Sequence, residues 1–536
     1  MEELFLLGNE SCALGALDAG ISHAYGYPGT PSTEIMNYIG SGKYRTSAAA
    51  SWCTNEKTAF EAAVGASYIG KRSLVVMKHV GLNVAADAFV NAVLQEINGG
   101  LVIVAADDPG MHSSQNEQDS RFYADFARTI CLEPGDHQEA YAMMLDAFDV
   151  SERFHIPVLF RMVTRLSHSR AIVKRKPVPV SEPVSLVQAA GPWICLPLFA
   201  RKNNRRLLDN QKLFREYSET APCTTLEINE SFRKFGIITC GIAGQYFREI
   251  VSDLSQRPSH LHVGTYPVAV EKVRQLAAEV ESIIVIEEGY PFVERQLRSL
   301  ISDPLPIRGK LDGTIPDAGE LTPDLVFESL SSPAGGTQEL PLPDIPVRFS
   351  QLCTGCPHID TFKFVQAARK RYTDLIVMAD IGCYTLGALP PYSLLDCAIC
   401  MGASISMARG AADAGARHVV ALIGDSSFLH TGIAPLIDAV AASVPLVVLI
   451  LDNRTVAMTG GQPTILHSDS LPDLIAGTGV DSKHIRKVVP LPSHHAANTA
   501  LLEQELDFRG VSVIISRREC VRKTNKTHPG APNHEI

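Results

Sequence analysis

The chain has 536 residues, which is too long for one hydrophobic core, and roughly 150 residues per domain would give three or four domains. Apolar residues make up 46% of the chain and charged residues 20%, an ordinary globular composition. The net charge of −10 argues against a nucleic-acid partner, because affinity for phosphates depends on clustered Lys and Arg.

The first residues lack the basic start and the long apolar stretch of a secretion signal. No window approaches the roughly 18 apolar residues that a membrane-spanning helix needs. The nearest one, Ile437 to Leu451, is interrupted by Asp438, Ser443 and Pro445. We therefore expect a cytoplasmic protein that does not enter a membrane. Its twelve cysteines point to metal or cluster ligation by some of them rather than to disulfides.

Strands and helices alternate along residues 1–170, which predicts a parallel α/β sheet. Residues 171–232, with a Pro-rich stretch and a basic run, are interpreted as an irregular connecting segment. A smaller α/β unit is predicted for residues 233–305, with a strand that ends at Glu287-Glu288. Residues 306–348 are rich in Pro, Gly, Asp and Ser, and are interpreted as a linker. The alternation returns over residues 349–522, and residues 523–536 form a polar tail.

The most informative stretch lies in the last α/β region. The apolar strand Val419 to Ile423 ends at Gly424-Asp425-Ser426, and the next strand, Leu446 to Leu451, is followed by Asn453. Because adjacent parallel strands end at one crevice, Asp425 and Asn453 are expected to converge. A carboxylate and an amide oxygen suit Mg²⁺ with diphosphate oxygens, and the helix after Gly424 would offer backbone N–H groups to the phosphates.

This spacing resembles the thiamine-diphosphate motif, in which Asp425, Asn453 and the carbonyl of Thr455 would bind Mg²⁺. The alternative is an ordinary strand-helix-strand unit, with the Asp as a helix cap and the Asn in a turn.

Thiamine diphosphate also needs a carboxylate against its pyrimidine ring in a pocket that excludes water. Glu56 precedes an apolar helix and is the first candidate. Glu61 competes with it, but Glu56 is preferred because it lies at the junction of a strand and a helix. In the alternative interpretation, Glu56 only interacts favourably with the dipole of that helix.

The Pro/Gly turn Tyr27 to Glu34 opens another helix. Its hydroxyl groups are candidates for contacts with a substrate's carboxylate or keto oxygen. In the alternative, Ser32 or Thr33 simply caps the helix.

Several long segments, in the same order, resemble the alpha subunits of indolepyruvate:ferredoxin oxidoreductases, and the resemblance extends from about residue 5 to about residue 520. These segments are Tyr27 to Glu34, Asn55-Glu56-Lys57, Met77 to Asn83, Asp107 to Asn116, Cys353-x-x-Cys356-Pro357-His358, Asp380 to Tyr384, Gly424 to Gly432 and Asp452 to Pro463.

The resemblance implies a thiamine-diphosphate-binding fold, with two parallel-sheet α/β domains, of the pyrimidine and diphosphate types, flanking a smaller α/β domain like the C-terminal domain of transketolase. It implies that Glu56 activates the pyrimidine and that Thr30 lies beside the substrate. His112 and Arg121 become candidates for contacts with the substrate's carboxylate. The residues implied to bind the cofactor are His358, Tyr384, Gly424, Asp425, Ser426, Asn453 and Thr455.

An oxidative reaction must remove two electrons, one at a time. Cys353 and Cys356 have the spacing of a chelating pair, Cys383 follows a strand, and Cys520 follows the last strand. These positions resemble the [4Fe–4S] ligands of the wider 2-oxoacid:ferredoxin oxidoreductase superfamily. The alternatives are a structural zinc site and unligated thiols. Another pair, Cys397 and Cys400, lies in a mostly apolar segment and is interpreted as core.

Relatives in this family usually add a ferredoxin-like module with two Cys-x-x-Cys-x-x-Cys runs, and this sequence contains no such run. Electrons would then leave from the cluster of the 349–522 region, either directly to ferredoxin or through another protein. The family further implies a smaller beta subunit, hence a hetero-oligomer, and coenzyme A as co-substrate.

The expected reaction is thus oxidative decarboxylation of an arylpyruvate such as indolepyruvate to an acyl-CoA. The alternatives are a non-oxidative thiamine-diphosphate-dependent decarboxylase or carboligase, and a non-catalytic scaffold subunit. The residues do not determine which 2-oxoacid is preferred.

Overall fold

The computed structural model describes residues 2–42, 48–176, 194–301, 305–331, 351–466 and 468–523. The chain divides into two compact units, Met1–Leu342 and Pro343–Ile536, and each is described by itself. Among the described helices, none combines the length and the apolar character that crossing a bilayer requires.

The first unit is built on a seven-stranded sheet whose central strands β4, β5 and β7 are buried almost throughout, as expected for parallel strands covered on both faces. All neighbouring strands in it are parallel except β12 and β6. The strands, in spatial order, are β12 (Thr265–Tyr266), β6 (Cys131–Leu132), β7 (Val158–Val163), β5 (Leu101–Asp107), β4 (Ser73–Lys78), β2 (His23–Gly26) and β3 (Ala49–Trp52).

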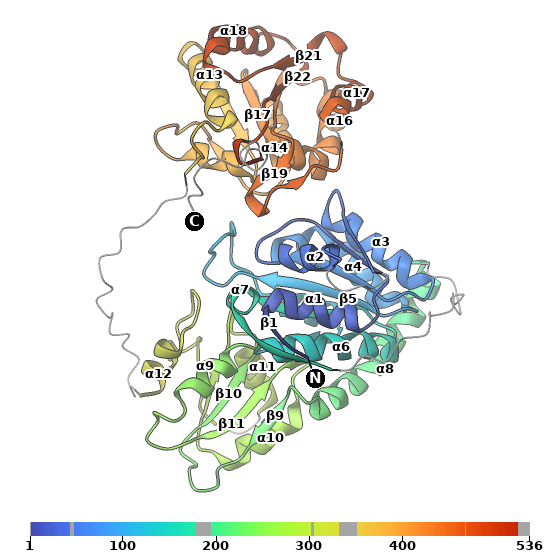
Figure 1. Cartoon of the computed structure of the whole chain (residues 1–536), viewed down its shortest axis with the longest axis vertical. Helices are drawn as coiled ribbons and strands as arrows, with labels where there is room; N and C mark the ends of the chain where they lie inside the picture. The colour runs from blue at the N-terminus through green and yellow to red at the C-terminus, as the bar shows by residue number, and fades with distance from the viewer. Residues whose placement is uncertain are drawn as a thin grey trace. The chain divides into compact units, whose positions relative to one another are not determined.

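The helices of this region follow the predicted alternation, and Figure 1 shows them around the blue and cyan strands. A separate antiparallel pair, β1 (Glu2–Leu7) and β8 (Arg170–Arg175), joins the two ends of the region. The helices are α1 (Gly8–Asp18), α2 (Thr33–Gly40), α3 (Glu56–Tyr68), α4 (His79–Gln95), α5 (Arg121–Ala127), α6 (His137–Phe154) and α7 (Thr164–His168).

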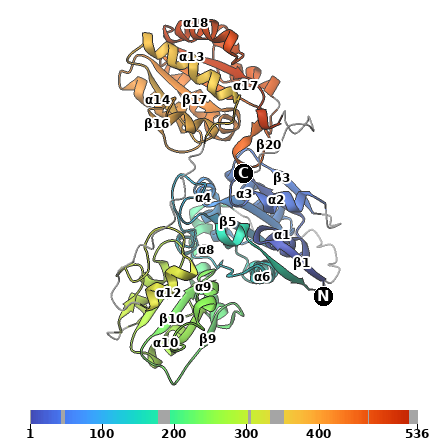
Figure 2. The ribbon, with the colours of Figure 1, turned by 60° about the vertical axis from the view of Figure 1, so that its left-hand side comes forward.

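A five-stranded sheet forms the second part of the same unit, and Figure 2 shows it with α9 and α10 alongside. Its strands, in spatial order, are β14 (Ile307–Arg308), β13 (Ile283–Ile286), β10 (Gly236–Cys240), β11 (Ser259–Val263) and β9 (Thr225–Glu227). Its helices are α9 (Ala243–Ile250), α10 (Val270–Glu279), α11 (Phe292–Leu300) and α12 (Pro323–Ser331). One continuous hydrophobic core joins both sheets, and β12 of the second part pairs with β6 at the edge of the first sheet.

Two predicted boundaries differ from the structure. The expected connecting segment contains α8 (Pro197–Thr220), a helix of 24 residues that buries Leu207 and Phe214. The expected linker begins later than residue 306, because β14 joins the five-stranded sheet and α12 places Val326 in the core. The rest of the linker, residues 332–348, and all of the tail after residue 523 lie outside the described residues.

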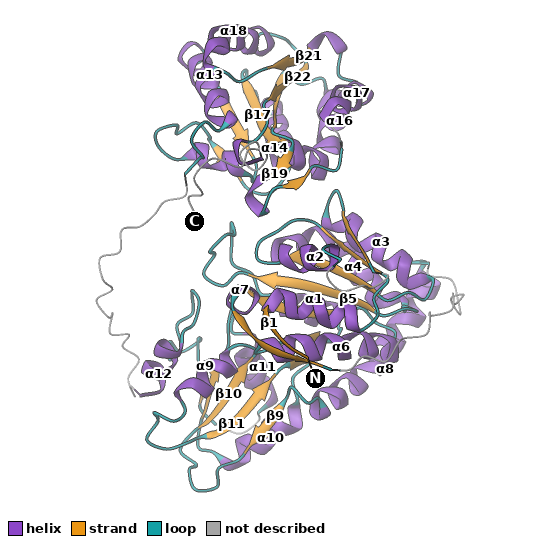
Figure 3. Cartoon of the chain, viewed as in Figure 1, coloured by secondary structure: helices purple, strands orange, loops and turns teal. Residues whose placement is uncertain are grey.

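The second unit is a three-layer α/β/α arrangement (Figure 3). Its parallel sheet has the strand order β16 (Cys397–Ala398), β15 (Ile376–Ala379), β17 (Val419–Gly424), β18 (Leu446–Asp452), β22 (Val511–Arg517) and β21 (Ile485–Val488). Residues of β17 alternate between two hydrophobic clusters, one on each face of the sheet. One cluster includes α13 (Pro357–Arg371) and α18 (His495–Leu506), and the other α14 (Ala403–Asp413), α16 (Ile433–Ala442) and α17 (Leu471–Gly477).

Short elements complete the second unit and lie mainly in its loops. They are η1 (Cys383–Ala388), α15 (Asp425–Ser427), η2 (Phe428–Gly432), β19 (Thr455–Val456), η3 (Ala457–Thr459), β20 (Gln462–Pro463), η4 (Ser468–Ser470), η5 (Ser482–His484) and η6 (Pro492–His494).

Candidate active-site residues

The strand ends that carry Asp425 and Asn453 lie side by side, as the sequence predicted. Strands β17 and β18 are neighbours in the sheet and run parallel, with Gly424 opposite Leu451. The two loops are also joined directly, because the backbone N–H of Arg454 donates to Asp425 Oδ2 at 2.8 Å. The carboxylate and the amide therefore belong to one edge of one sheet.

Asp425 is almost fully buried, with 3% of its surface exposed. Burial, and after it the charge of Asp452, raise its pKa to about 8. Asn453 Oδ1 accepts the N–H of Thr455 at 3.1 Å. A buried carboxylate with so unfavourable an ionisation is one that a bound cation would stabilise, and the oxygen donors beside it are those that Mg²⁺ prefers. The residues present thus fit a magnesium ion.

The helix that starts after Gly424 is continuous but irregular, because the turn of α15 passes into the π-helical η2 before α16. Gly424 and Gly382 both lie against the ring of Tyr384. A Cβ at Gly382 would be 2.4 Å from Tyr384 Cε1, and one at Gly424 would be 2.8 Å from it. Only glycine therefore allows both loops to approach this ring.

The buried carboxylate of Asp380, a residue to which the sequence assigned no role, holds the ring of Tyr384 in place. The Tyr384 hydroxyl donates to Asp380 Oδ1, and the other Asp380 oxygen accepts the N–H of Gly402 at 2.7 Å. Burial raises the pKa of Asp380 to about 7. Asp380 could have been found by the rule that identified Asp425, since it also follows an apolar strand, β15.

His358 lies beside Tyr384 and Asn453. Its ring packs edge-on against Tyr384, with 5.9 Å between ring centres, and its Nε2 is 3.5 Å from Asn453 Nδ2. Burial and the nearby Arg518 guanidinium lower the pKa of His358 to about 4. His358 is therefore neutral near pH 7 and presents a polar but uncharged edge.

The four cysteines proposed as ligands lie near these loops. The N–H of Cys520 donates to the Asn453 carbonyl at 3.2 Å, and the Arg518 guanidinium donates to the carbonyl of Gly355, between Cys353 and Cys356. Burial, with the charges of the other thiols of the set, raises the pKa of Cys356 to about 11 and that of Cys383 to about 12.

Each of these thiols is thus close enough to affect the ionisation of another. Four thiols form a donor set suited to an iron–sulfur cluster. Within the described ranges, however, no three His, Cys, Asp or Glu side chains are arranged closely enough to hold a metal ion.

The other cysteine pair differs from the prediction. Cys400 is exposed, and Cys397 is half-buried with its sulfur 3.7 Å from the sulfur of Met407. Interpreting both as core was therefore wrong for Cys400. The reason is that β16, which carries Cys397, is the edge strand of its sheet.

In the first unit, Glu56 is the first residue of α3 and only 5% of its surface is exposed. Asn55 caps the helix by accepting the N–H of Thr58 at 2.8 Å, which fixes the point where the helix begins. Gly81 of α4 lies directly against Glu56, since a Cβ there would be 2.6 Å from Glu56 Oε1. Glu61 is half-exposed and pairs with Lys57 on the surface. Burial thus favours Glu56 over Glu61.

The Pro/Gly turn uses its hydroxyls internally. Ser32 and Thr33 both donate to the Gly29 carbonyl, at 2.8 and 3.1 Å, and neither hydroxyl caps α2. The helix-cap alternative therefore does not hold. Thr30 is half-buried, and its carbonyl accepts the hydroxyl of Ser113 at 3.4 Å, so the turn contacts the loop after β5.

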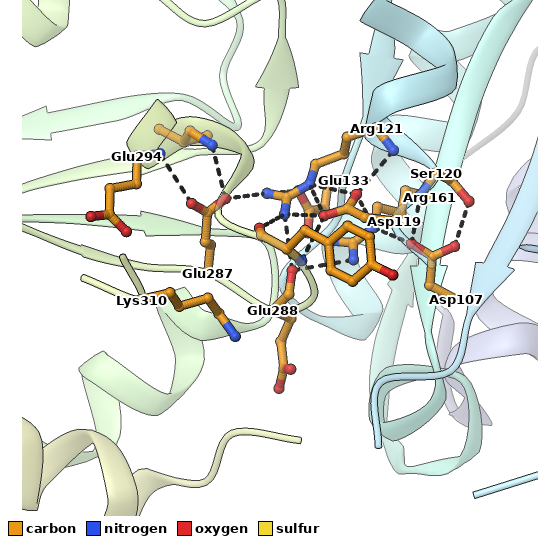
Figure 4. A network of polar contacts seen from close by, with 12 residues as sticks. Asp107, Asp119, Ser120, Arg121, Glu133, Arg161, Glu287, Glu288, Glu294 and Lys310 are labelled. Carbon is orange, nitrogen blue, oxygen red and sulfur yellow. Dashed lines mark hydrogen bonds and ion pairs between the residues drawn. The ribbon is translucent and has the colours of Figure 1, made fainter. Parts of the chain in front are cut away.

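Arg121 does not suit the role of substrate ligand suggested for it. Its side chain is fully buried, and its guanidinium binds Asp119 at 2.5 Å, Glu287 at 2.9 Å and two backbone carbonyls (Figure 4). The sequence did not indicate this burial, because Glu287 and the two carbonyl groups lie more than 160 residues further along the chain and only Asp119 is a near neighbour. His112, in contrast, is half-exposed, with Nε2 3.5 Å from Glu320 Oε2.

Two family models match the chain. The model described as "Pyruvate flavodoxin/ferredoxin oxidoreductase, thiamine diP-bdg" matches residues 14–189. The model described as "Thiamine pyrophosphate enzyme, C-terminal TPP binding domain" matches residues 380–481. The first match contains Glu56, and the second contains Asp425 and Asn453.

Curated relatives match nearly the full chain. Indolepyruvate oxidoreductase subunit IorA from Methanothermobacter thermautotrophicus is 36% identical over 543 residues, covering 97% of this chain and 87% of the relative. The protein of the same name from Archaeoglobus fulgidus is 34% identical, with 97% and 86% covered. Among solved structures, 2-oxoglutarate:ferredoxin oxidoreductase from Magnetococcus marinus has a TM-score of 0.51 and 16% identity, with 61% of this chain and 65% of that chain covered. This last likeness shows the fold alone.

Proposed function

Since the chain belongs to the family of indolepyruvate oxidoreductase alpha subunits, which are thiamine-diphosphate-dependent 2-oxoacid:ferredoxin oxidoreductases, we propose that it decarboxylates arylpyruvates such as indolepyruvate oxidatively. In this proposal it acts in the cytoplasm with a smaller beta subunit, the acyl group passes to coenzyme A, and the electrons pass to ferredoxin. The observation that carries the proposal is the junction of the Asp425 and Asn453 loops at one sheet edge.

The residues of the second unit would hold the diphosphate end of the cofactor. Asp425, Asn453 and the carbonyl of Thr455 would supply oxygens to Mg²⁺, and the loop from Gly424 to Ser426 would lie against the phosphates. Tyr384 and His358 form a neutral wall beside them. When bound, thiamine diphosphate supplies the electron sink that allows carbon dioxide to leave the 2-oxoacid.

Replacing Asp425 by Ala is expected to weaken thiamine-diphosphate binding at least about 100-fold in the presence of Mg²⁺, because the charged metal ligand is lost. Calorimetric titration of the anaerobic protein measures this. Asp438→Ala is the control, since Asp438 lies exposed on α16 of the same unit and pairs only weakly with Arg409 at 3.8 Å. Equal affinities in the two variants would contradict the assignment of Asp425.

The cysteines separate the oxidative reaction from a non-oxidative one. Protein purified anaerobically should contain about four iron atoms per chain if Cys353, Cys356, Cys383 and Cys520 hold a [4Fe–4S] cluster. Cys356→Ala should lose most of this iron and its visible absorbance, whereas Cys195→Ala should keep both, because Cys195 is exposed and belongs to the other unit. Wild-type protein without iron would instead indicate a non-oxidative decarboxylase or carboligase, and zinc would indicate a structural site.

The activity itself is tested by anaerobic co-expression with the beta subunit. Indolepyruvate, phenylpyruvate and pyruvate are each supplied with coenzyme A, and reduction of a viologen dye or of ferredoxin is followed. We expect faster reduction with the two arylpyruvates than with pyruvate. Faster reduction with pyruvate would overturn the aryl preference, and no reduction with any of them would overturn the proposed function.

A further inference from the structure

Lys78 ends the strand β4 at a position where an open α/β sheet binds ligands. In the seven-stranded sheet, β2 and β4 are neighbours. The chain leaves β2 toward β3 on one side and leaves β4 toward β5 on the other side. Connections that leave in opposite directions open a crevice outside the carboxyl ends of those two strands. Lys78 is the last residue of β4, and β2 ends at Gly26, where the Pro/Gly turn begins.

The side chain of Lys78 connects the segments proposed to surround the substrate. Its methylene groups lie against Gly29, where a Cβ would be 3.1 Å from Lys78 Cγ. Its Nζ donates to the Ser113 carbonyl at 3.2 Å, and the Ser113 hydroxyl donates to the Thr30 carbonyl. The ammonium thus lies between the turn that contains Thr30 and the loop that follows β5.

Two carboxylates, those of Asp108 and Glu56, act on this ammonium. Asp108 accepts hydrogen bonds from Ser113, Ser114 and Thr164, so its charge is already compensated. Glu56 is the other one, and it is the carboxylate proposed to meet the cofactor. Burial lowers the pKa of Lys78 and the two carboxylates partly offset this, which leaves the pKa at about 8, so the group still carries positive charge near neutral pH.

An ammonium has three N–H donors, and an incoming carboxylate is a stronger acceptor than a backbone carbonyl. The two cations suggested from the sequence are less suited to meet one. Arg121 is fully buried among acidic side chains, and His112 faces Glu320. Lys78 is half-buried at the end of β4, lies against Gly29 next to Thr30, and is close enough to Glu56 for the two charges to interact.

We propose that Lys78 binds the carboxylate of the 2-oxoacid substrate and holds the substrate's keto carbon in place beside Thr30. This inference rests on the proposed function, because it assumes that a 2-oxoacid is the substrate.

The test uses the complex with the beta subunit, purified anaerobically, and compares wild type with K78M, K78R and the control K57M. Lys57 is a surface residue of α3 that pairs with Glu61. K78M should raise KM for phenylpyruvate by about 10- to 100-fold with a much smaller change in kcat, since a charge-assisted hydrogen bond is lost. K78R should raise KM less, and K57M should leave both constants unchanged.

A second measurement separates binding of the carboxylate from support of the loop. Phenylacetaldehyde has the same aryl group but no carboxylate, so its inhibition constant should change less than about twofold in K78M. An unchanged KM for phenylpyruvate, or an equal loss of affinity for phenylacetaldehyde, would overturn the inference. If K78M does not fold, K78Q gives the same comparison. A wild-type complex that oxidises no 2-oxoacid would overturn the proposed function itself, and this is seen before any variant is made.

Discussion

Replacing Glu56 by Gln should lower kcat about a thousandfold while thiamine diphosphate still binds. Gln has the shape of Glu but cannot exchange a proton with the pyrimidine ring, and positioned acid–base groups contribute roughly 10²- to 10⁴-fold to rates. The cofactor should still bind, because the proposed metal and phosphate contacts belong to the second unit. Turnover is measured by anaerobic dye reduction, and cofactor affinity by titration.

The matched control is Glu61→Gln, five residues further along the same helix. Glu61 is half-exposed and its partner is Lys57, so the substitution should change kcat less than about twofold. If Glu61→Gln were the inactive variant, or if Glu56→Gln kept full turnover, the role of Glu56 would be wrong. Full turnover of Glu56→Gln would also favour a non-catalytic role for the chain.

Replacing Arg121 by Met should destabilise the first unit by about 3–5 kcal/mol, because removing one partner leaves buried charges uncompensated. Arg121 and Arg161 lie among four buried carboxylates, those of Asp107, Asp119, Glu133 and Glu287, as Figure 4 shows. Their partners come from both sheets of the unit. Urea titration, followed with more than one spectroscopic probe, measures this loss in the free energy of unfolding.

Arg295→Met on α11 is the control, since Arg295 is exposed and its loss should change stability by less than about 0.5 kcal/mol. The same variants distinguish the two roles considered for Arg121. A substrate ligand would give a raised KM and unchanged unfolding. A stable Arg121→Met protein with a raised KM would therefore contradict the structural role described above.

The sequence predicted that Asp425 and Asn453 converge, because strand ends in parallel sheets follow a local rule. Apolar runs locate β17 and β18, and their adjacency brings Asp425 and Asn453 together without any knowledge of the rest of the fold. The alternation of strands and helices over residues 1–170 and 349–522 was likewise predicted, since the apolar patterns there are regular. For Glu56 the sequence indicated a buried helix start, and burial now supports that choice.

Features that depend on distant partners were not predicted. Arg121 and Glu287 are far apart in sequence, and no local pattern indicates that they form a pair. Helix α8 is mostly polar and buries few of its residues, so its apolar signal is weak. Residues 306–331 resemble a linker in composition, yet β14 and α12 are held by strand pairing and by the core.

The apolar segment around the second cysteine pair led to a wrong prediction for Cys400, which is exposed. Both Cys353-x-x-Cys356 and Cys397-x-x-Cys400 have the same separation, and both lie in the same unit. What distinguishes them is the fold, which brings Cys356 near Cys383 and Cys520 but leaves Cys400 on the surface.

The edge strand β12 makes the seven-stranded sheet depend on a distant part of the chain. It is supplied by residues 265–266, well beyond the match to the family model that ends at residue 189, and the shared core extends to Val326. The segment that this family model matches therefore lacks one strand of its own sheet. A substitution that disrupts the five-stranded part of the unit would therefore also affect the sheet beside Glu56. It would leave β6 unpaired on one side and remove partners of the buried guanidinium groups of Arg121 and Arg161.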